Sequence, residues 1–185
     1  MARTVRKFPK AQIAEIANYY ADPKTKHARD YFAEKYGISH KRFYAILEKA
    51  IIQGIVSDEI AEAMKYKAEN NAREKVGNKA INRTREHYSR IMKQRKEYQL
   101  PKKQAVKIAK EYSITSTPKG EFARKNYMTV ELLNRTIKRC IVENLIEDDV
   151  VRVLEMKSLA KDNSQNVQIF WRRLWEIRKE NMNQG

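Results

Sequence analysis

Residues 29–48 read RDYFAEKYGISHKRFYAILE and place apolar side chains at helical spacing on both sides of a glycine. Gly37 can adopt the positive φ that ends a helix, and Ser39 is a favourable N-cap for a helix that follows. Phe43, Leu47, Ala50 and Ile51 would then share the inward face of that second helix. The stretch therefore predicts two helices joined by a tight turn.

A third helix is predicted upstream of this pair. Pro9 suits the first turn of a helix that extends to Tyr20, because its missing N–H would have no partner there in any case. The helix before Gly37 is predicted to run from about Thr25 to Tyr36. Its predicted apolar face consists of Ala28, Tyr31 and Phe32. The three helices would form one packed unit.

The remainder of the first half also favours helices over strands. Ser57 is a good cap for a helix that continues towards Asn71, and residues 80–98 form a strongly basic helical segment. The whole chain contains only 5 Gly and 4 Pro, and no stretch sustains the alternation of polar and apolar residues that is typical of strands. We therefore expect an all-α protein.

The second half of the chain repeats the plan of the first. Identical or similar residues occur in the same order in both halves, with small length differences where loops are expected. The identical pairs include Pro9 with Pro101, Tyr20 with Tyr112, Phe32 with Phe122, Ile51 with Ile141, Asp58 with Asp148, Lys67 with Lys157, and Arg95 with Arg178. Such an ordered series indicates a duplication. We predict two tandemly repeated helical units, residues 1–98 and residues 99–185.

The second unit is expected to have the same helices. Pro101 would start its first helix, Pro118 would open the second, and Thr129 would cap the third. The acidic run that begins at Glu147 suits the start of a fourth helix, where negative charge complements the helix dipole. The last helix carries four large apolar side chains that are expected to pack in the core: Phe170, Trp171, Leu174 and Trp175.

Residues 29–48 resemble the signature of helix-turn-helix DNA-binding proteins. That family has a small residue, a turn glycine and apolar residues at fixed positions, which are here Ala33, Gly37, Phe32, Tyr36, Ile38, Phe43 and Ile46. With the helix from Pro9, the resemblance is to the trihelical version of the motif, of the homeodomain-like or transposase-like type. It implies that the second helix of the motif projects its polar face into the major groove.

Residues 119–138, KGEFARKNYMTVELLNRTIK, resemble the same signature with two departures. Tyr127 replaces the turn glycine, and Thr136 replaces an apolar residue. Asn126 could supply the positive φ instead, with a possible shift of register by one residue, because asparagine tolerates that conformation. The second motif is therefore predicted to be the weaker of the two.

The resemblance implies which side chains face DNA. They are polar residues at the start and along the outer side of the second helix of each motif: Ser39, His40, Lys41, Arg42 and Tyr44 in the first unit, and Thr129, Glu131, Asn134, Arg135 and Lys138 in the second. Arginine and asparagine can each make paired hydrogen bonds with a base edge, guanine and adenine respectively. These residues would read the sequence of the duplex.

Other basic residues are candidates for contacts with the DNA backbone. The predicted phosphate contacts are Lys26, Arg29, Lys35, Lys125, Arg83, Arg85 and Arg90. The last three lie in the basic fifth helix, which also carries Arg95. This helix could follow the phosphate backbone, or it could be an oligomerisation helix with a solvated basic face.

Composition restricts the partners and the compartment. The net charge of +16 favours an anionic partner such as nucleic acid. Cys140 is the only cysteine, so no intrachain disulfide and no cysteine-based zinc site can form, and its apolar neighbours suggest a buried thiol. No apolar run approaches the length of a membrane span, and the first residues lack the apolar segment of a signal peptide. We expect a cytoplasmic protein without a membrane partner, associated with the nucleoid if its source is a bacterium or a phage.

No catalytic signature is found in the sequence. There is no glycine-rich phosphate loop and no zinc-protease motif, and His27, His40 and His87 are widely separated. We expect neither enzymatic activity nor a cofactor or metal. The predicted function is sequence-specific binding of double-stranded DNA, as in a transcription regulator of a phage or mobile element. The alternatives are an accessory protein of DNA packaging, replication or segregation with the same fold, and an RNA-binding or structural assembly protein.

The two predicted recognition helices differ in sequence, and this bears on the symmetry of the DNA site. His40, Lys41 and Tyr44 in the first have Val130, Glu131 and Asn134 as their counterparts in the second. Two covalently joined and unlike motifs predict that one chain binds a bipartite, non-palindromic site. The alternative is a homodimer on a palindrome, with one motif reduced to a structural or dimer-forming unit.

Overall fold

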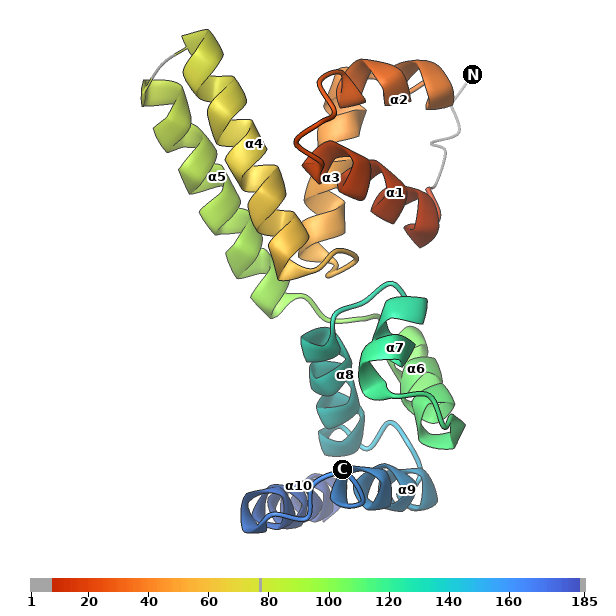
Figure 1. Cartoon of the computed structure of the whole chain (residues 1–185). Helices are drawn as coiled ribbons and strands as arrows, with labels where there is room; N and C mark the ends of the chain where they lie inside the picture. The colour runs from red at the N-terminus through yellow and green to blue at the C-terminus, as the bar shows by residue number, and fades with distance from the viewer. Residues whose placement is uncertain (1–7, 77, 184–185) are drawn as a thin grey trace. The chain divides into compact units, whose positions relative to one another are not determined.

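A computed structural model describes residues 8–76 and 78–183 (Figure 1). These residues form helices joined by short connections and contain no strand, which confirms the all-α prediction. The helices are α1 (Lys10–Ala21), α2 (Ala28–Tyr36), α3 (His40–Ile52), α4 (Asp58–Val76), α5 (Asn78–Glu97), α6 (Lys102–Ile114), α7 (Lys119–Lys125), α8 (Val130–Val142), α9 (Asp148–Leu159) and α10 (Gln165–Asn183).

The chain forms two compact units that divide after Tyr98. The first comprises Met1–Tyr98 together with Tyr127–Thr129, and the second comprises Gln99–Asn126 and Val130–Gly185. Helices α1 to α5 belong to the first unit and helices α6 to α10 to the second.

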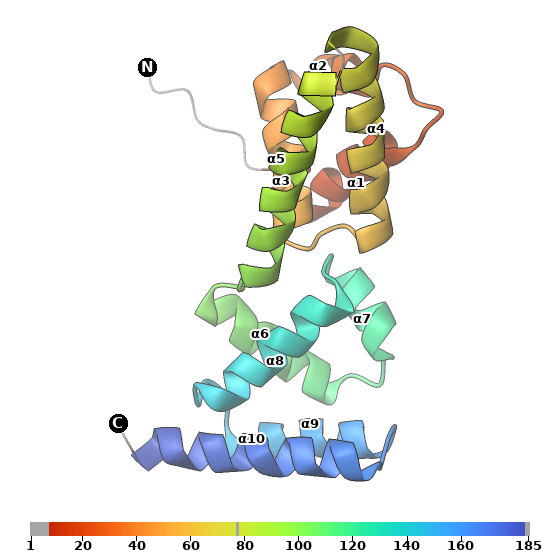
Figure 2. The ribbon, with the colours of Figure 1, turned by 90° about the vertical axis from the view of Figure 1, so that its left-hand side faces the viewer.

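In the first unit, α3 is held between other helices on two sides. It contacts α1, α2 and α5, while α4 contacts α1 and runs alongside α5 (Figures 1 and 2). Every helix of the unit contributes to the core, which includes the fully buried side chains of Ile16, Phe32, Phe43, Met64 and Ile91. The side chains of Leu47, Ala50 and Ile51 are also buried, which confirms the predicted inward face of α3.

The second unit has the same set of neighbours around its third helix. Helix α8 contacts α6, α7 and α10, and α9 contacts α6 and lies beside α10 (Figure 2). The core includes Leu133, Ile141 and Val151, and Cys140 is fully buried among them, as predicted. Burial raises the pKa of the Cys140 thiol to about 11.

The aromatic last helix is only partly in the core. Trp171 and Leu174 are buried, but Phe170 is 46% exposed and Trp175 is half-buried, with its indole Nε1 donating to the Glu155 carboxylate at 2.8 Å. The prediction that all four large side chains pack in the core is therefore wrong for Phe170. Positions 170 and 171 are adjacent on a helix, so they point in directions about 100° apart and cannot share one narrow apolar stripe.

A buried arginine ties α5 to the loop between α3 and α4. The Arg95 guanidinium donates to the carbonyl of Ile51 at 3.2 Å and to that of Val56 at 3.0 Å, and it lies 2.9 Å from the Asp58 carboxylate. Only 5% of Arg95 is exposed. Arg95 therefore does not belong to the basic surface that was predicted for this helix, because its charge is used to satisfy carbonyls inside the unit.

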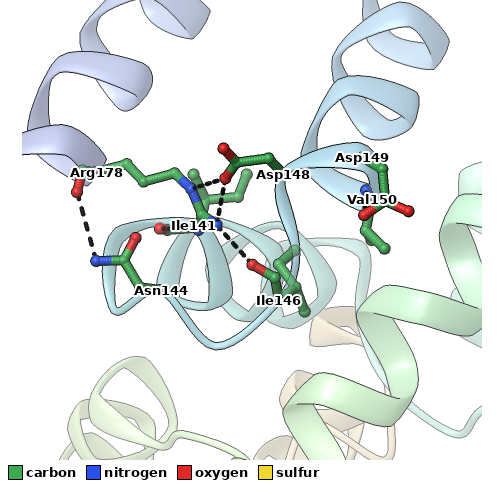
Figure 3. A network of polar contacts seen from close by, with 7 residues as sticks. All are labelled: Ile141, Asn144, Ile146, Asp148, Asp149, Val150 and Arg178. Carbon is green, nitrogen blue, oxygen red and sulfur yellow. Dashed lines mark hydrogen bonds and ion pairs between the residues drawn. The ribbon is translucent and has the colours of Figure 1, made fainter. Parts of the chain in front are cut away.

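Arg178 makes the corresponding contacts in the second unit (Figure 3). Its guanidinium donates to the carbonyl of Ile141 at 3.1 Å and to that of Ile146 at 2.7 Å, and it binds Asp148 through Nε at 2.9 Å and Nη2 at 2.7 Å. Asn144 adds a hydrogen bond from its side-chain amide to the Arg178 carbonyl at 3.4 Å. These bonds fix α10 against the end of α8.

In each unit, a lysine of the fourth helix donates hydrogen bonds to backbone carbonyls at or beyond the end of the first helix. In the first unit, the Lys67 ammonium donates to the carbonyl and, at 2.8 Å, to the hydroxyl of Thr25. In the second, the Lys157 ammonium donates to the carbonyls of Tyr112 and Thr115. Because Thr25 is held in this loop, α2 starts at Ala28, three residues later than predicted.

The turns before α3 and α8 each contain one residue with a positive φ at matching positions. Gly37 has φ +62° and ends α2, as predicted. In the turn before α8, Tyr127 has φ +49°, whereas Asn126 has φ −93°. The expectation that Asn126 would supply the turn is therefore wrong, and the register does not shift. The other departure from the signature, Thr136, is buried and donates its hydroxyl to the Leu132 carbonyl at 2.7 Å within its own helix.

Two further details differ from the sequence-based expectations. Tyr31, which was assigned to the apolar face of α2, is 43% exposed and stacks on the ring of Tyr19 with 5.1 Å between centroids. Helix α4 continues past Asn71 to Val76. The longer helix extends the pairing of α4 with α5.

Candidate nucleic-acid interface

The start of α3 presents polar side chains to solvent. The Ser39 hydroxyl accepts a hydrogen bond from the Arg42 backbone N–H at 3.3 Å and caps the helix as predicted. Ser39, His40, Lys41 and Tyr44 are exposed, with half of the tyrosine surface accessible. Arg42 is half-buried, and its guanidinium lies 5.7 Å from the centroid of the Phe8 ring, on a different side of the helix. Four of the five predicted base contacts of this unit are thus exposed.

His40 and Arg29 share one carboxylate. The Asp30 side chain lies 3.4 Å from His40 Nε2 and 2.9 Å from Arg29 Nε. The hydrogen bond from Arg29 lowers the pKa of Asp30, with smaller contributions from the charges of Arg29, His40 and His27. The negative charge of Asp30 therefore offsets part of the positive potential that these two predicted DNA contacts would otherwise supply.

A pocket of about 490 Å³ separates the outer side of α3 from α5. Its polar lining includes Lys41, Tyr44 and Glu48 from α3 and Arg83 and His87 from α5. The Arg90 guanidinium lies 3.1 Å from His87 Nδ1, so that it extends this line of basic groups along α5. Predicted base contacts and a predicted phosphate contact, far apart in the sequence, therefore line one surface.

Most of the other predicted phosphate contacts form ion pairs with acidic residues of the same chain. Arg29 binds Asp30, as described above. Three others have carboxylate partners: Lys35 with Glu15 at 2.7 Å, Arg85 with Glu69 at 3.3 Å, and Lys125 with Glu121 at 2.9 Å. Within the described part of the chain, Lys26 and Arg83 have no such partner. The ion pairs of Arg29, Lys35 and Lys125 are exposed and therefore weak, whereas Glu69, the partner of Arg85, is largely buried.

Three of the five predicted contacts of the second unit share a pocket with its last helix. Glu131, Asn134 and Lys138 are exposed, and Thr129 and Arg135 are half-buried. Asn134, Arg135 and Lys138 line a pocket of about 640 Å³ between α8 and α10. In both units the polar outer side of the third helix is thus bordered by the fifth helix.

Sequence reasoning missed several residues of these surfaces. His87 lies one helical turn from Arg83 and from Arg90, so the helical period could have placed it with them. Lys119, at the start of α7, and Lys161, after the end of α9, line the pocket of the second unit. No periodicity relates them, because separate segments of the chain bring them to the pocket.

Other kinds of site find no support in the described residues. Within residues 8–76 and 78–183, no group of three or more His, Cys, Asp or Glu side chains is arranged to hold a metal ion. No helix in the part of the chain that the structure describes combines the length and apolar character needed to cross a bilayer. No protein-family model, curated protein or solved structure matches the chain.

Proposed function

We propose that this protein binds double-stranded DNA in a sequence-specific manner, with α1–α3 and α6–α8 as two helix-turn-helix units. Helices α3 and α8 would read the major groove, which is wide enough to admit an α-helix. The observation that carries the proposal is the shared surface of α3 and α5. Lys41 and Tyr44, which would contact bases, line the same pocket as Arg83, which would contact a phosphate.

The electrostatics of the chain support this proposal. The net charge of +16 attracts a polyanion over a long range, and neutralisation of phosphates releases bound counterions. Lys41 is exposed, and Arg83 has no acidic partner within the described residues, so that both charges are available for a ligand. DNA binding would therefore require little rearrangement at this surface.

We further propose that the two units arose by duplication. The matching contacts of Arg95 and Arg178, and those of Lys67 and Lys157, support this relationship, because each pair occupies matching positions in the two halves of the sequence. Since the outer sides of α3 and α8 carry different side chains, one chain would bind two unlike half-sites.

Affinity for defined nucleic acids tests the proposal. Fluorescence anisotropy would compare a random duplex, a single strand and a structured RNA, and selection from a random duplex library would then identify a preferred site. If the two units neutralise on the order of 6–10 phosphates, log affinity should fall with log salt at a slope of about −0.9 per phosphate. Equal or tighter binding of RNA, or affinity that does not depend on salt, would contradict the proposal.

A pair of matched variants tests the surface itself. Lys41→Ala with Arg83→Ala should weaken duplex binding by about tenfold or more and reduce the salt slope by about 1 for each lost phosphate contact. Lys24→Ala with Lys93→Ala removes the same charge at two exposed positions outside the pocket and should have a smaller effect. Equal losses in both double variants would refute a localised interface on α3 and α5.

The selected site and the mass of the complex test the arrangement of the two units. One chain on a bipartite, non-palindromic site is the expected result. A palindromic consensus bound by two chains would show instead that only one unit reads DNA.

A further inference from the structure

The pocket of the second unit has the size and lining of a small-molecule site. Its volume of about 640 Å³ lies within the range of roughly 300–1,000 Å³ that is typical of ligand pockets. Its apolar lining comes from α8, α9 and α10: Ile137, Ile141, Leu154, Val167, Phe170, Trp171 and Leu174. Such a surface favours an apolar ligand body.

The polar part of the lining is strongly cationic. The basic side chains that line the pocket are Lys119, Arg135, Lys138, Lys157 and Lys161. Among the described residues that line it, Asp162 is the only carboxylate, and one of its oxygens already accepts the Ser164 backbone N–H at 2.9 Å. The Lys157 ammonium is bound to backbone carbonyls, so its charge is partly used within the unit. The ammonium groups of Lys119, Lys138 and Lys161 leave an excess of positive charge around the apolar lining.

Two of these cations, Lys119 and Lys161, line the pocket from separate segments of the chain. Burial lowers the pKa of the half-buried Lys119, and the charge of the exposed Lys161 lowers it further, so the two ammonium groups repel each other. An anion placed near both groups would relieve this repulsion and would gain from reduced screening at a half-buried position.

We propose that this pocket binds a small amphipathic organic anion. The apolar body of the ligand packs against Trp171 and Leu174, and its acidic group lies beside Lys119 and Lys161. The ligand is a free molecule rather than a membrane surface, because the apolar lining belongs to a pocket of limited volume between helices of one unit.

The two tryptophans of the chain provide a direct assay for this ligand. Both lie on α10, and Trp171 lines the pocket, so that indole emission reports on its occupancy. The full chain would be titrated with decanoate, 1-decanol and decylammonium below their critical micelle concentrations. These probes have the same apolar body with a negative, neutral or positive head group. Decanoate should bind at least tenfold more tightly than decylammonium, with 1-decanol between them. Equal affinities of the three probes would overturn the proposal.

Charge reversal at the two lysines tests where the acidic group lies. Lys119→Glu with Lys161→Glu should reduce decanoate affinity by at least tenfold and improve binding of decylammonium, with an unchanged circular dichroism spectrum. Lys103→Glu with Lys179→Glu makes the same change of charge at exposed positions of this unit that do not line the pocket, and it should leave the preference for decanoate in place.

Two other outcomes of these titrations would contradict the proposed anion site. If both charge reversals lower decanoate affinity equally, the anion responds only to net charge and the proposed site is wrong. If the protein binds vesicles of anionic phospholipid but none of the free probes, the cationic surface serves a membrane and the proposal is likewise overturned. None of these measurements contains DNA, so their result is independent of the proposed DNA binding.

Discussion

Replacement of Arg178 by methionine is expected to destabilise the second unit. Methionine retains much of the length and apolar volume of the arginine stem, so that the main loss is the guanidinium and its hydrogen bonds. Arg178 is only 3% exposed, and its bonds reach the loop between α8 and α9 and the first residue of α9 (Figure 3). The substitution would leave carbonyls that accept from Arg178 without this donor.

The size of the effect follows from the individual contacts. A hydrogen bond to a charged group contributes about 1.5–3 kcal/mol. The bond to Ile146 at 2.7 Å should be in the upper part of that range, whereas the Ile141 carbonyl also accepts a backbone N–H from Asn144 at 3.3 Å and loses less. The Asp148 side chain is 54% exposed, so the ion pair adds at most about 1 kcal/mol. The bond to Ile146 alone accounts for most of about 3 kcal/mol and the other two contacts add to it, so Arg178→Met should cost at least about 3 kcal/mol.

Urea unfolding of the full chain measures this loss. Tryptophan emission reports on the second unit, because Trp171 and Trp175 are the only tryptophans and both lie on α10. Arg173→Met is the matched control, since Arg173 is an exposed arginine on the same helix. Its free energy of unfolding should change by no more than about 0.5 kcal/mol. A loss below about 1 kcal/mol for Arg178→Met, or an equal loss for the control, would contradict the stabilising role of the Arg178 hydrogen bonds.

Three further predictions concern other parts of the chain. Gly37→Ala should lower the free energy of unfolding by about 1 kcal/mol in urea titrations followed by circular dichroism, because φ at this residue is +62° and an L side chain is strained there; unchanged stability would contradict this. The buried Cys140 thiol, with its pKa raised to about 11, stays protonated at pH 8 and should react with an aromatic disulfide reagent only as fast as the unit unfolds. Rapid labelling in the absence of urea would contradict the buried position. Decanoate should lower the affinity of the protein for a DNA duplex, because Asn134 and Lys138 line the pocket and are predicted DNA contacts. This competition should disappear in the Lys119→Glu, Lys161→Glu variant, and competition that persists there would contradict binding of decanoate at these lysines.

Features that depend on near neighbours along the chain could be predicted from the sequence. The apolar period of α3, its Ser39 cap and the left-handed turn at Gly37 are local, because each depends on side chains and backbone within a few residues. The same is true of the exposed polar residues at the start of α3, since burial of Phe43 and Leu47 on one side of a helix leaves Lys41 and Tyr44 towards another.

The contacts between residues far apart in the sequence could be identified only from the tertiary structure. Arg95 and Arg83 are both arginines of one basic helix. The first is buried against the carbonyls of Ile51 and Val56, whereas the second lines the same pocket as Lys41. The positive φ of Tyr127 could not be predicted from the sequence, because residues other than glycine, asparagine and aspartate rarely adopt that conformation. Such outcomes depend on which carbonyls need a donor and on which helices meet, and these are properties of the folded chain.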